Sequence, residues 1–480
     1  INANENNNYQ NKLDEALLSQ DSAADDDKID IFLIEADYAL KYVDSDYVLD
    51  VKKDIGLTDS DLAGQYQYTK DIVSVDGSQR GTTWQATPGL FAYRRSIAKD
   101  VLGTDDPAEV QTYLSDWDKF NDVAAKAAAK ELLDNPMGHA IPTYGGPGLS
   151  TEEKAEAIWN FFLTESADHI FSRYFIDTKD ESGTKMPVFN GPSGYHAWGG
   201  NTPVQDLVDA FAMEDGSKFD WSNAQHAAAP YSGREPRFYA TIMYDGMQWI
   251  QRPSDYATIE PTGKIQTGYY QLDPSVTDES KFYSGMDTRA GGGESWNATY
   301  TGYYLKKYIN PADGDHRNKI NAIFPFIRLS EIYFCYIEAC IELGELDEAK
   351  KYLNEYRANV NLPAVTTNDQ AELRKIYQNE RRLEFCYEEI RYWDLRRWMI
   401  APDAPGLNSL KGIRVTAWLK PGIGAQTKYN ADPTKWDMKY QVIDLAEEAR
   451  QFVDKCYYLP IMRDEMNSNK NLIQNPGYSD

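Results

Sequence analysis

Three loops of the sequence place tryptophan or tyrosine beside polar side chains. The loop RAGGGESWNATY contains Arg289, Glu294, Trp296, Asn297 and Tyr300 behind a run of glycines. An aromatic ring can pack on the apolar face of a ligand, while amide, guanidinium and carboxylate groups bond its hydroxyl groups. This loop is therefore our first candidate for a ligand-binding site.

The other two loops have a similar composition. The candidate contacts are Tyr195, His196, Trp198 and Asn201 in GPSGYHAWGGN, and Trp249 and Arg252 in MYDGMQWIQRP. Loops of this kind bind ligands when a rigid scaffold holds them in place. For each single aromatic residue the alternative is that it only anchors its own loop.

The sequence offers little support for catalysis or for a bound metal. A glycosidase needs two carboxylates roughly 5–10 Å apart across a cleft, whereas adjacent acids such as Glu152 and Glu153 point apart on a helix. No G-x-S-x-G, Walker or dinucleotide motif stands in a suitable context. The five histidines form no H-E-x-x-H pattern. We expect no catalytic residues, no metal and no cofactor.

The charge balance argues against nucleic acid as a partner. The 480 residues include 75 Asp and Glu against 49 Lys and Arg, a formal net charge of −26 that repels phosphate and anionic lipid. No run of 18 apolar residues suggests a membrane helix, and Ile1 opens no signal-peptide pattern. We expect a mature or trimmed soluble portion. The four cysteines lack C-x-x-C spacing and are expected to be buried thiols.

A helical block between Ile327 and Trp398 is the expected scaffold for the loops. Apolar residues recur at three- and four-residue spacing in IRLSEIYFCYIEACIELG, and Gly344 ends that helix. A second helix then places Ala349, Leu353 and Tyr356 on one face. The pattern predicts an antiparallel hairpin of the tetratricopeptide type, which must stack on neighbouring helices to bury its apolar face.

The stretch RRLEFCYEEIRYWDLRRWM, residues 381–399, is expected to form another helix of this scaffold. The predicted inward stripe consists of Ile376, Leu383, Cys386, Ile390 and Trp393, and the charged row of Arg381, Glu384, Glu388, Arg391, Asp394 and Arg397. Exposed pairs contribute only about 0.3–0.5 kcal/mol each. We therefore expect part of the row to be desolvated and paired with carboxylates such as Glu331 or Glu338.

The first part of the chain has a different pattern. The apolar run Ile29 to Ile34 reads as a buried strand within an α/β segment, and the chain length favours two or more domains. Glycine and proline cluster in long loops after Pro136. One further helix is expected near residues 445–452.

Six ordered motifs make residues 127–480 similar to the SusD/RagB family of surface glycan-binding lipoproteins. These are GGNTPVQDLVDAFAMEDG, REPRFYATIMYDG, TGYYLKKYI, RLSEIYFCYIEACIELGELDEAKKYLNEYRA, QNERRLEFCYEEIRYWDLRRW and LPIMRDEMNSNKNLIQNPGY. The resemblance implies a mostly α fold with tetratricopeptide-type hairpins and long loops. It also implies non-catalytic binding of oligosaccharide or polysaccharide for delivery to a SusC-like TonB-dependent outer-membrane transporter. The implied location is the outer surface of the outer membrane, through a lipid anchor that this chain lacks.

Residues 1–126 instead resemble an extracellular sugar-binding protein of ABC transporters, in DIFLIEADYALKYV, GQYQYTKDIVSVDG and TTWQATPGLFAYRRSIAKDVLGTDDP. That resemblance would place Trp84, Gln85, Tyr93 and Arg94 near a sugar cleft, although the second lobe is missing. We hypothesise a chimera of 1–126 and 127–480, joined in an Ala/Lys-rich helix. The alternative is a diverged SusD-like first part. The alternative functions are the binding component of an ABC transporter and a structural docking module for a membrane transporter.

Overall fold

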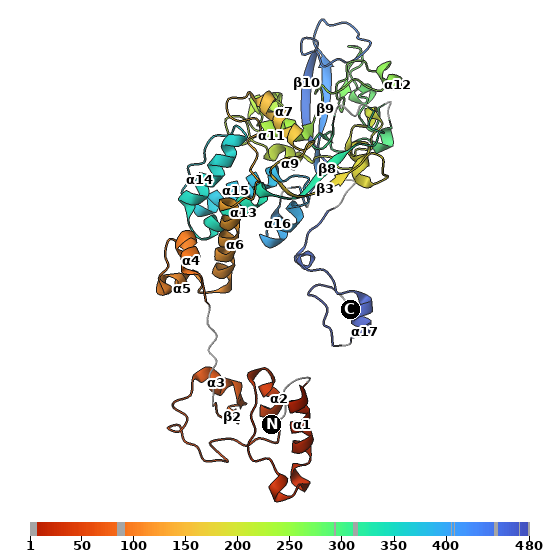
Figure 1. Cartoon of the computed structure of the whole chain (residues 1–480). Helices are drawn as coiled ribbons and strands as arrows, with labels where there is room; N and C mark the ends of the chain where they lie inside the picture. Colours follow the sequence, from red (N-terminus) through yellow and green to blue (C-terminus); the bar gives the residue numbers. More distant parts are fainter. Residues whose placement is uncertain are drawn as a thin grey trace. The chain divides into compact units, whose positions relative to one another are not determined.

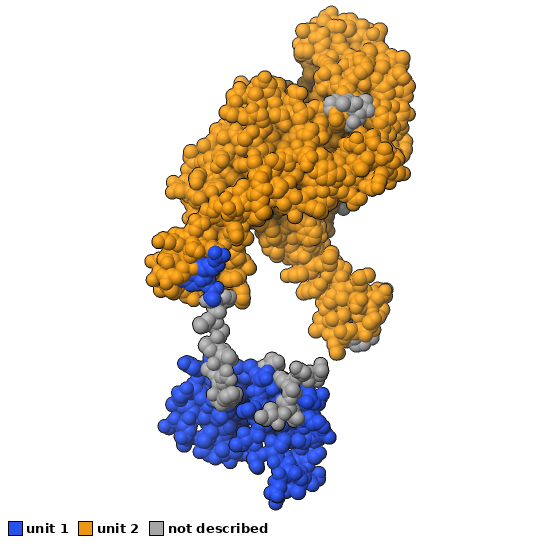
Figure 2. Space-filling view, viewed as in Figure 1, with its two compact units in different colours: residues 1–94 blue, residues 95–480 orange. Residues whose placement is uncertain are grey.

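The computed structural model describes residues 7–83, 92–291, 294–310, 315–404, 406–407, 409–445, 450–469 and 471–478. The chain divides into two compact units, residues 1–94 and 95–480, which Figure 2 shows in different colours. Each unit is described by itself. The sequence boundary at 126/127 stays a prediction, and in the structure it falls inside the continuous helix α6 (Trp117–Asp134) of the second unit.

The first unit is small, and short helices are its main regular elements. Its elements are α1 (Asn8–Leu18), α2 (Ala39–Val43), α3 (Gln67–Ile72), β1 (Ser74–Val75) and β2 (Ser78–Gln79). The predicted strand at 29–34 is wrong, because this segment has no regular secondary structure. The side-chain amide of Gln20 bonds both the N–H and the carbonyl of Ile29, which a strand partner would otherwise use. Phe32 and Ile34 pack instead against Leu13, Leu17 and Tyr42.

Helices dominate one end of the second unit (Figure 1). Over the whole of the second unit, the described helices are α4 (Arg95–Leu102), α5 (Pro107–Tyr113), α6, α7 (Thr151–Phe161), α8 (Met186–Asn190), α9 (Gln205–Ala210), α10 (Ala224–Ala228), α11 (Pro236–Thr241), α12 (Ser254–Ala257), α13 (Leu329–Glu342), α14 (Leu346–Asn359), α15 (Gln370–Glu384), α16 (Arg391–Arg397) and α17 (Arg463–Ser468). The helix α13 packs on α6, α14 and α15 around one apolar core.

The predicted hairpin is confirmed by α13 and α14. Gly344 adopts a φ of 78° between them, a conformation that glycine takes without strain. Ala349, Leu353 and Tyr356 are fully buried on the inner face of α14. The hairpin stacks on α6 and α15, as a unit with one apolar face requires.

The predicted single helix through 381–399 is wrong. α15 ends at Glu384, α16 begins at Arg391, and Tyr387 and Glu389 between them both have a φ of 63°. The break turns Trp393 outward, where it is 65% exposed, so it does not belong to the inward stripe. Within the break, Glu388 bonds the buried side chains of Arg328 and Lys307.

Buried ion pairs join these helices to the rest of the unit. Arg328 bonds Asp168 at 2.8 Å, Glu384 at 3.1 Å and Glu388 at 2.8 Å. The predicted pairing is also confirmed: Arg381 bonds Glu331 at 3.3 Å, and Arg397 bonds Glu338. Removing one partner would strand a buried charge, so the network fixes the relative positions of the elements.

In the part of the second unit that the structure describes, the strands form three small sheets. Their bounds are β3 (His169–Phe175), β4 (Ile242–Met243), β5 (Tyr269–Tyr270), β6 (Tyr283–Ser284), β7 (Tyr304–Leu305), β8 (Ala322–Arg328), β9 (Lys411–Leu419) and β10 (Trp436–Asp444). The four-stranded sheet has the order β10-β9-β5-β6, while β3 pairs with β8 and β4 with β7, both antiparallel.

The helix predicted near residues 445–452 lies partly outside the described residues. The described positions 445 and 450–452 are not helical. All four cysteines are free thiols: Cys340 and Cys386 are buried, whereas Cys335 and Cys456 are half-buried.

Candidate functional site

The first candidate loop presents exposed aromatic side chains around one arginine. Trp296 lies in a short 3₁₀ turn and is 72% exposed, and Tyr300 is 48% exposed. The guanidinium of Arg289 lies 3.8 Å from the centre of the Tyr300 ring and donates to the carbonyls of Trp296 at 2.9 Å and Ala298 at 3.1 Å. Arg289 therefore holds the loop with both rings facing solvent.

The side chains of Asn297 and Glu294 lie in the same loop. The Asn297 amide donates to the Glu294 carboxylate at 3.2 Å, and both residues are half-buried. Each retains further hydrogen-bonding capacity for a hydroxyl group of a ligand.

The second loop contacts the first. Gly199 has a φ of 51°, and a Cβ atom there would lie 3.0 Å from the carbonyl oxygen of Asn297. The neighbouring Trp198 is 46% exposed and packs on Phe189, with ring centres 5.4 Å apart. Trp198 and Trp296 thus each stand one residue from the contact between the loops. The side chain of Asn201 donates to Asn190 at 2.6 Å.

A buried tyrosine forms hydrogen bonds to both loop regions. The Tyr304 hydroxyl donates to the carbonyl of Asp287 at 2.8 Å, accepts the Thr299 N–H at 3.0 Å and lies 3.3 Å from the Ser193 hydroxyl. Burial raises the pKa of Tyr304, which keeps the hydroxyl neutral. Its bonds fix both loops on β7.

Four of the predicted contact residues are buried: His196, whose contacts are given below, and three residues that serve as anchors. Tyr195 is fully buried and donates to the carbonyl of Ile250 at 3.0 Å, and Trp249 is 9% exposed within the same core cluster. The Arg252 guanidinium bonds Asp287 at 2.7 Å. These side chains do not face solvent, so a direct contact with a ligand finds no support in this structure.

The first two loops are bordered by three residues that the sequence did not single out, Asp255, Tyr256 and Arg317. His196, itself buried, stacks on Tyr256 with ring centres 4.6 Å apart and approaches Asp255 at 3.1 Å. Hydrogen bonding to Asp315 and the charges of Asp255 and Glu294 raise the pKa of Arg317. The sequence does show an acid next to a tyrosine at Asp255 and Tyr256, a pair that could have been predicted to bind a ligand. Nothing in the sequence indicated that this pair lies beside the first two loops.

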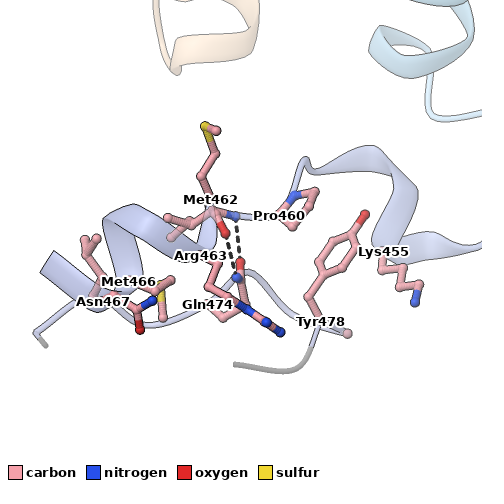
Figure 3. A pocket seen from close by; sticks show the side chains of 11 residues that line it. Lys455, Pro460, Met462, Arg463, Met466, Asn467, Gln474 and Tyr478 are labelled. Atoms are coloured by element: carbon pink, nitrogen blue, oxygen red, sulfur yellow. Dashed lines mark hydrogen bonds between the residues drawn. The ribbon is translucent and has the colours of Figure 1, made fainter. Parts of the chain in front are cut away.

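A separate hollow lies in the last segment of the chain (Figure 3). Its lining includes Met462, Met466, Arg463 and Tyr478, and the Gln474 amide bonds the N–H and the carbonyl of Ile461. None of the predicted contact residues lines it. Of the residues from the solute-binding resemblance, Trp84 and Gln85 lie outside the described residues, and Tyr93 and Arg94 end the first unit.

Comparison with models of protein families shows to which family this chain belongs. A model described as the SusD family matches residues 155–478. The chain belongs to the SusD family. A model described as bacterial extracellular solute-binding protein matches residues 2–183 as well, overlapping the SusD match over 155–183. Both resemblances seen in the sequence are thereby confirmed, and the fold is SusD-like and mostly helical.

Solved structures of SusD-like proteins resemble this SusD-family chain. One from Bacteroides fragilis NCTC 9343 is 26% identical with a TM-score of 0.51, and the match covers 80% of this chain and 65% of the other. A SusD-like carbohydrate-binding protein from the same organism is 26% identical with a TM-score of 0.46, covering 73% and 61%. The SusD-family chain thus spans less than two thirds of the length of these relatives. Among proteins with curated descriptions, none matches it.

SusD-family proteins are surface lipoproteins. Within the residues that the structure describes, no helix has the length and apolar character needed to cross a membrane. In the same residues, no three His, Cys, Asp or Glu side chains converge as a metal site.

Proposed function

We propose that this protein binds oligosaccharide or polysaccharide, without cleaving it, on the surface formed by the loops 195–201 and 294–300 together with Arg289. The observation that carries the proposal is the contact between these loops at Gly199 and Asn297, with Trp198 and Trp296 exposed beside it. Sugar rings pack on such aromatic faces, and the adjacent amide, carboxylate and guanidinium groups suit hydroxyl groups.

The scaffold supports this interpretation. Tyr304 and Arg289 hold the loops before a ligand arrives, so binding does not have to order them. Membership of the SusD family points to the same ligand class. Because SusD-like glycan-binding proteins are generally non-catalytic, we assign no catalytic residue.

The test is a glycan array with the native protein and Trp296→Ala. Trp393→Ala is the matched control, because Trp393 is similarly exposed but stands on the scaffold helix α16. We expect Trp296→Ala to lose signal for the glycans that the native protein retains, and Trp393→Ala to keep it. Equal binding by all three proteins contradicts this site, and release of sugar from a labelled oligosaccharide contradicts the non-catalytic assignment.

We also propose that this protein delivers the glycan to a TonB-dependent outer-membrane transporter. A lipid anchor would hold it at the cell surface. Family membership supports delivery, and co-purification with a SusC-like barrel tests it. If the protein co-purifies with the barrel but binds no glycan on the array, its function is that of a docking module.

The solute-binding match to residues 2–183 favours one second candidate, a sugar-binding component of an ABC transporter. In that case free mono- or disaccharides, rather than polysaccharides, would bind. Isothermal titration with both classes separates the two functions.

A further inference from the structure

The antiparallel ribbon of β3 and β8 exposes several apolar side chains. The two strands lie side by side and, within the described residues, form a sheet of their own (Figure 1). Six apolar side chains on these strands or directly after them are between 39% and 59% exposed: Ile170, Phe171, Tyr174, Ile176, Phe326 and Ile327. Single exposed apolar residues are common on protein surfaces, whereas a group of this size on one element indicates an interaction surface.

Part of this group is held together by contacts across the ribbon. Phe171 stands opposite Ile327, and the register shifts on both sides of that pair. The shifts leave Ile170 in β3 and Phe326 in β8 without a residue opposite them, and such bulges change which side chains share a face. The rings of Phe171 and Phe326 lie 5.9 Å apart. Both strands therefore contribute aromatic rings that contact each other and are also exposed to solvent.

The outer edge of β3 has free backbone groups. Among the described residues, positions 170–175 form no backbone hydrogen bond except those to β8. In an antiparallel pair, every second residue directs its N–H and C=O away from the partner strand. An open edge of this kind can pair with a further strand.

Of the two edges, that of β3 is better suited to pairing. Proline occurs in strands where its missing N–H faces away from the partner, so Pro325 removes a donor from the outer edge of β8. β3 contains no proline. It also contains one side chain that is always charged, Arg173, whose exposed ion pair with Glu181 contributes little stability.

We propose that β3 pairs antiparallel with β3 of a second copy of this chain, with Ser172 opposite the partner's Ser172. This register places Arg173 opposite the partner's Phe171, where a guanidinium can lie over the ring. A register centred on Arg173 would instead oppose two like charges, which destabilises paired strands. Because each copy offers the same edge to the other, the contact closes as a symmetric dimer.

The exposed apolar area is sufficient for such a dimer. An aromatic side chain has roughly 150–250 Å² of surface, so six side chains that are about half exposed offer roughly 600 Å² per copy. Two copies that cover them would bury about 1,200 Å², which is the lower end of the range for stable interfaces. We therefore expect a reversible dimer that dissociates on dilution.

Sedimentation equilibrium of the native chain over a range of concentrations tests the proposal. Added salt screens the repulsion between two copies of net charge −26. The mass is expected to rise from that of one chain to that of two. Phe171→Lys should raise the dimer Kd about ten-fold or more, because it removes the exposed ring and places a charge on the paired edge in both copies.

Trp393→Lys is the matched control, since it places the same charge on an exposed ring of α16 and should leave the dimer Kd unchanged. Thermal unfolding checks that both variants are folded. A native chain that stays monomeric at every concentration overturns the proposal, and so does a dimer that Phe171→Lys leaves intact. If the native chain is monomeric and Phe171→Lys prevents co-purification with a SusC-like barrel, the ribbon binds that partner and self-pairing is wrong.

A charge swap tests the register. Phe171→Lys opposes its ammonium to the partner's Arg173, and adding Arg173→Glu turns this repulsion into an attraction. The double variant should therefore dimerise more tightly than Phe171→Lys alone, and an equal or weaker dimer overturns this register. These measurements use no glycan, so their result is independent of the glycan-binding proposal.

Discussion

The exposed surfaces of Trp296 and Trp198 predict how much each contributes to glycan affinity. A tryptophan side chain buries about 250 Å² when fully covered, so the exposed fraction of 72% leaves roughly 180 Å² of Trp296 open. A sugar ring that covers half of this removes about 90 Å² from water, which at about 25 cal/mol per Å² stabilises the complex by about 2 kcal/mol. Trp296→Ala should therefore weaken Kd about 30-fold.

The same calculation gives a smaller effect for Trp198. Its exposed fraction of 46% predicts a loss of about 1.5 kcal/mol in Trp198→Ala, or about ten-fold in Kd. If the rings contact different sugar units of one chain, the free-energy losses should add in the double variant.

The assay is isothermal titration of the glycan that an array identifies, with Trp393→Ala as the control and Tm as the check on folding. A change below about two-fold in both single variants, with Tm unchanged, would refute the reasoning. It would mean that the exposed rings at the contact between the loops do not bind the sugar.

Three further predictions concern the scaffold. Arg328→Met should lower the free energy of unfolding by about 3–5 kcal/mol in denaturant titration, since it leaves buried carboxylates unpaired; a loss below 1 kcal/mol would contradict the network. Burial alone would raise the pKa of Glu384, but the charges of Arg328 and Arg237 outweigh it and lower that pKa below its ordinary value of 4.5. The stability due to Glu384 is therefore present above about pH 4.5 and lost as the pH falls further, so Glu384→Gln should reduce the slope of Tm against pH below that value, and an unchanged slope would count against it. Gly344→Ala should cost about 1–2 kcal/mol because of its left-handed conformation, whereas Gly424→Ala, whose Cβ meets open space without such a φ, should cost less; equal losses would show that the turn at Gly344 tolerates a side chain.

The sequence predicted the parts of this protein that depend on local periodicity. The spacing of Ala349, Leu353 and Tyr356 and the position of Gly344 define the hairpin of α13 and α14, because a helix buries the same face every three or four residues. The composition of the loop at 289–300 likewise indicated exposed rings beside polar groups. Trp296 and Tyr300 are indeed exposed, while their role in binding stays a prediction.

Only the tertiary structure decided which aromatic residues face solvent and which loops meet. Trp249 and Trp296 stand in loops of similar composition, yet one is buried in a core cluster and the other is open, because distant elements cover the first. The break between α15 and α16 likewise contains a contact that local sequence does not show, because Glu388 bonds Arg328, which lies 60 positions away in the chain. Local sequence determines the turn of a helix, whereas burial depends on residues far away in the chain that pack against it.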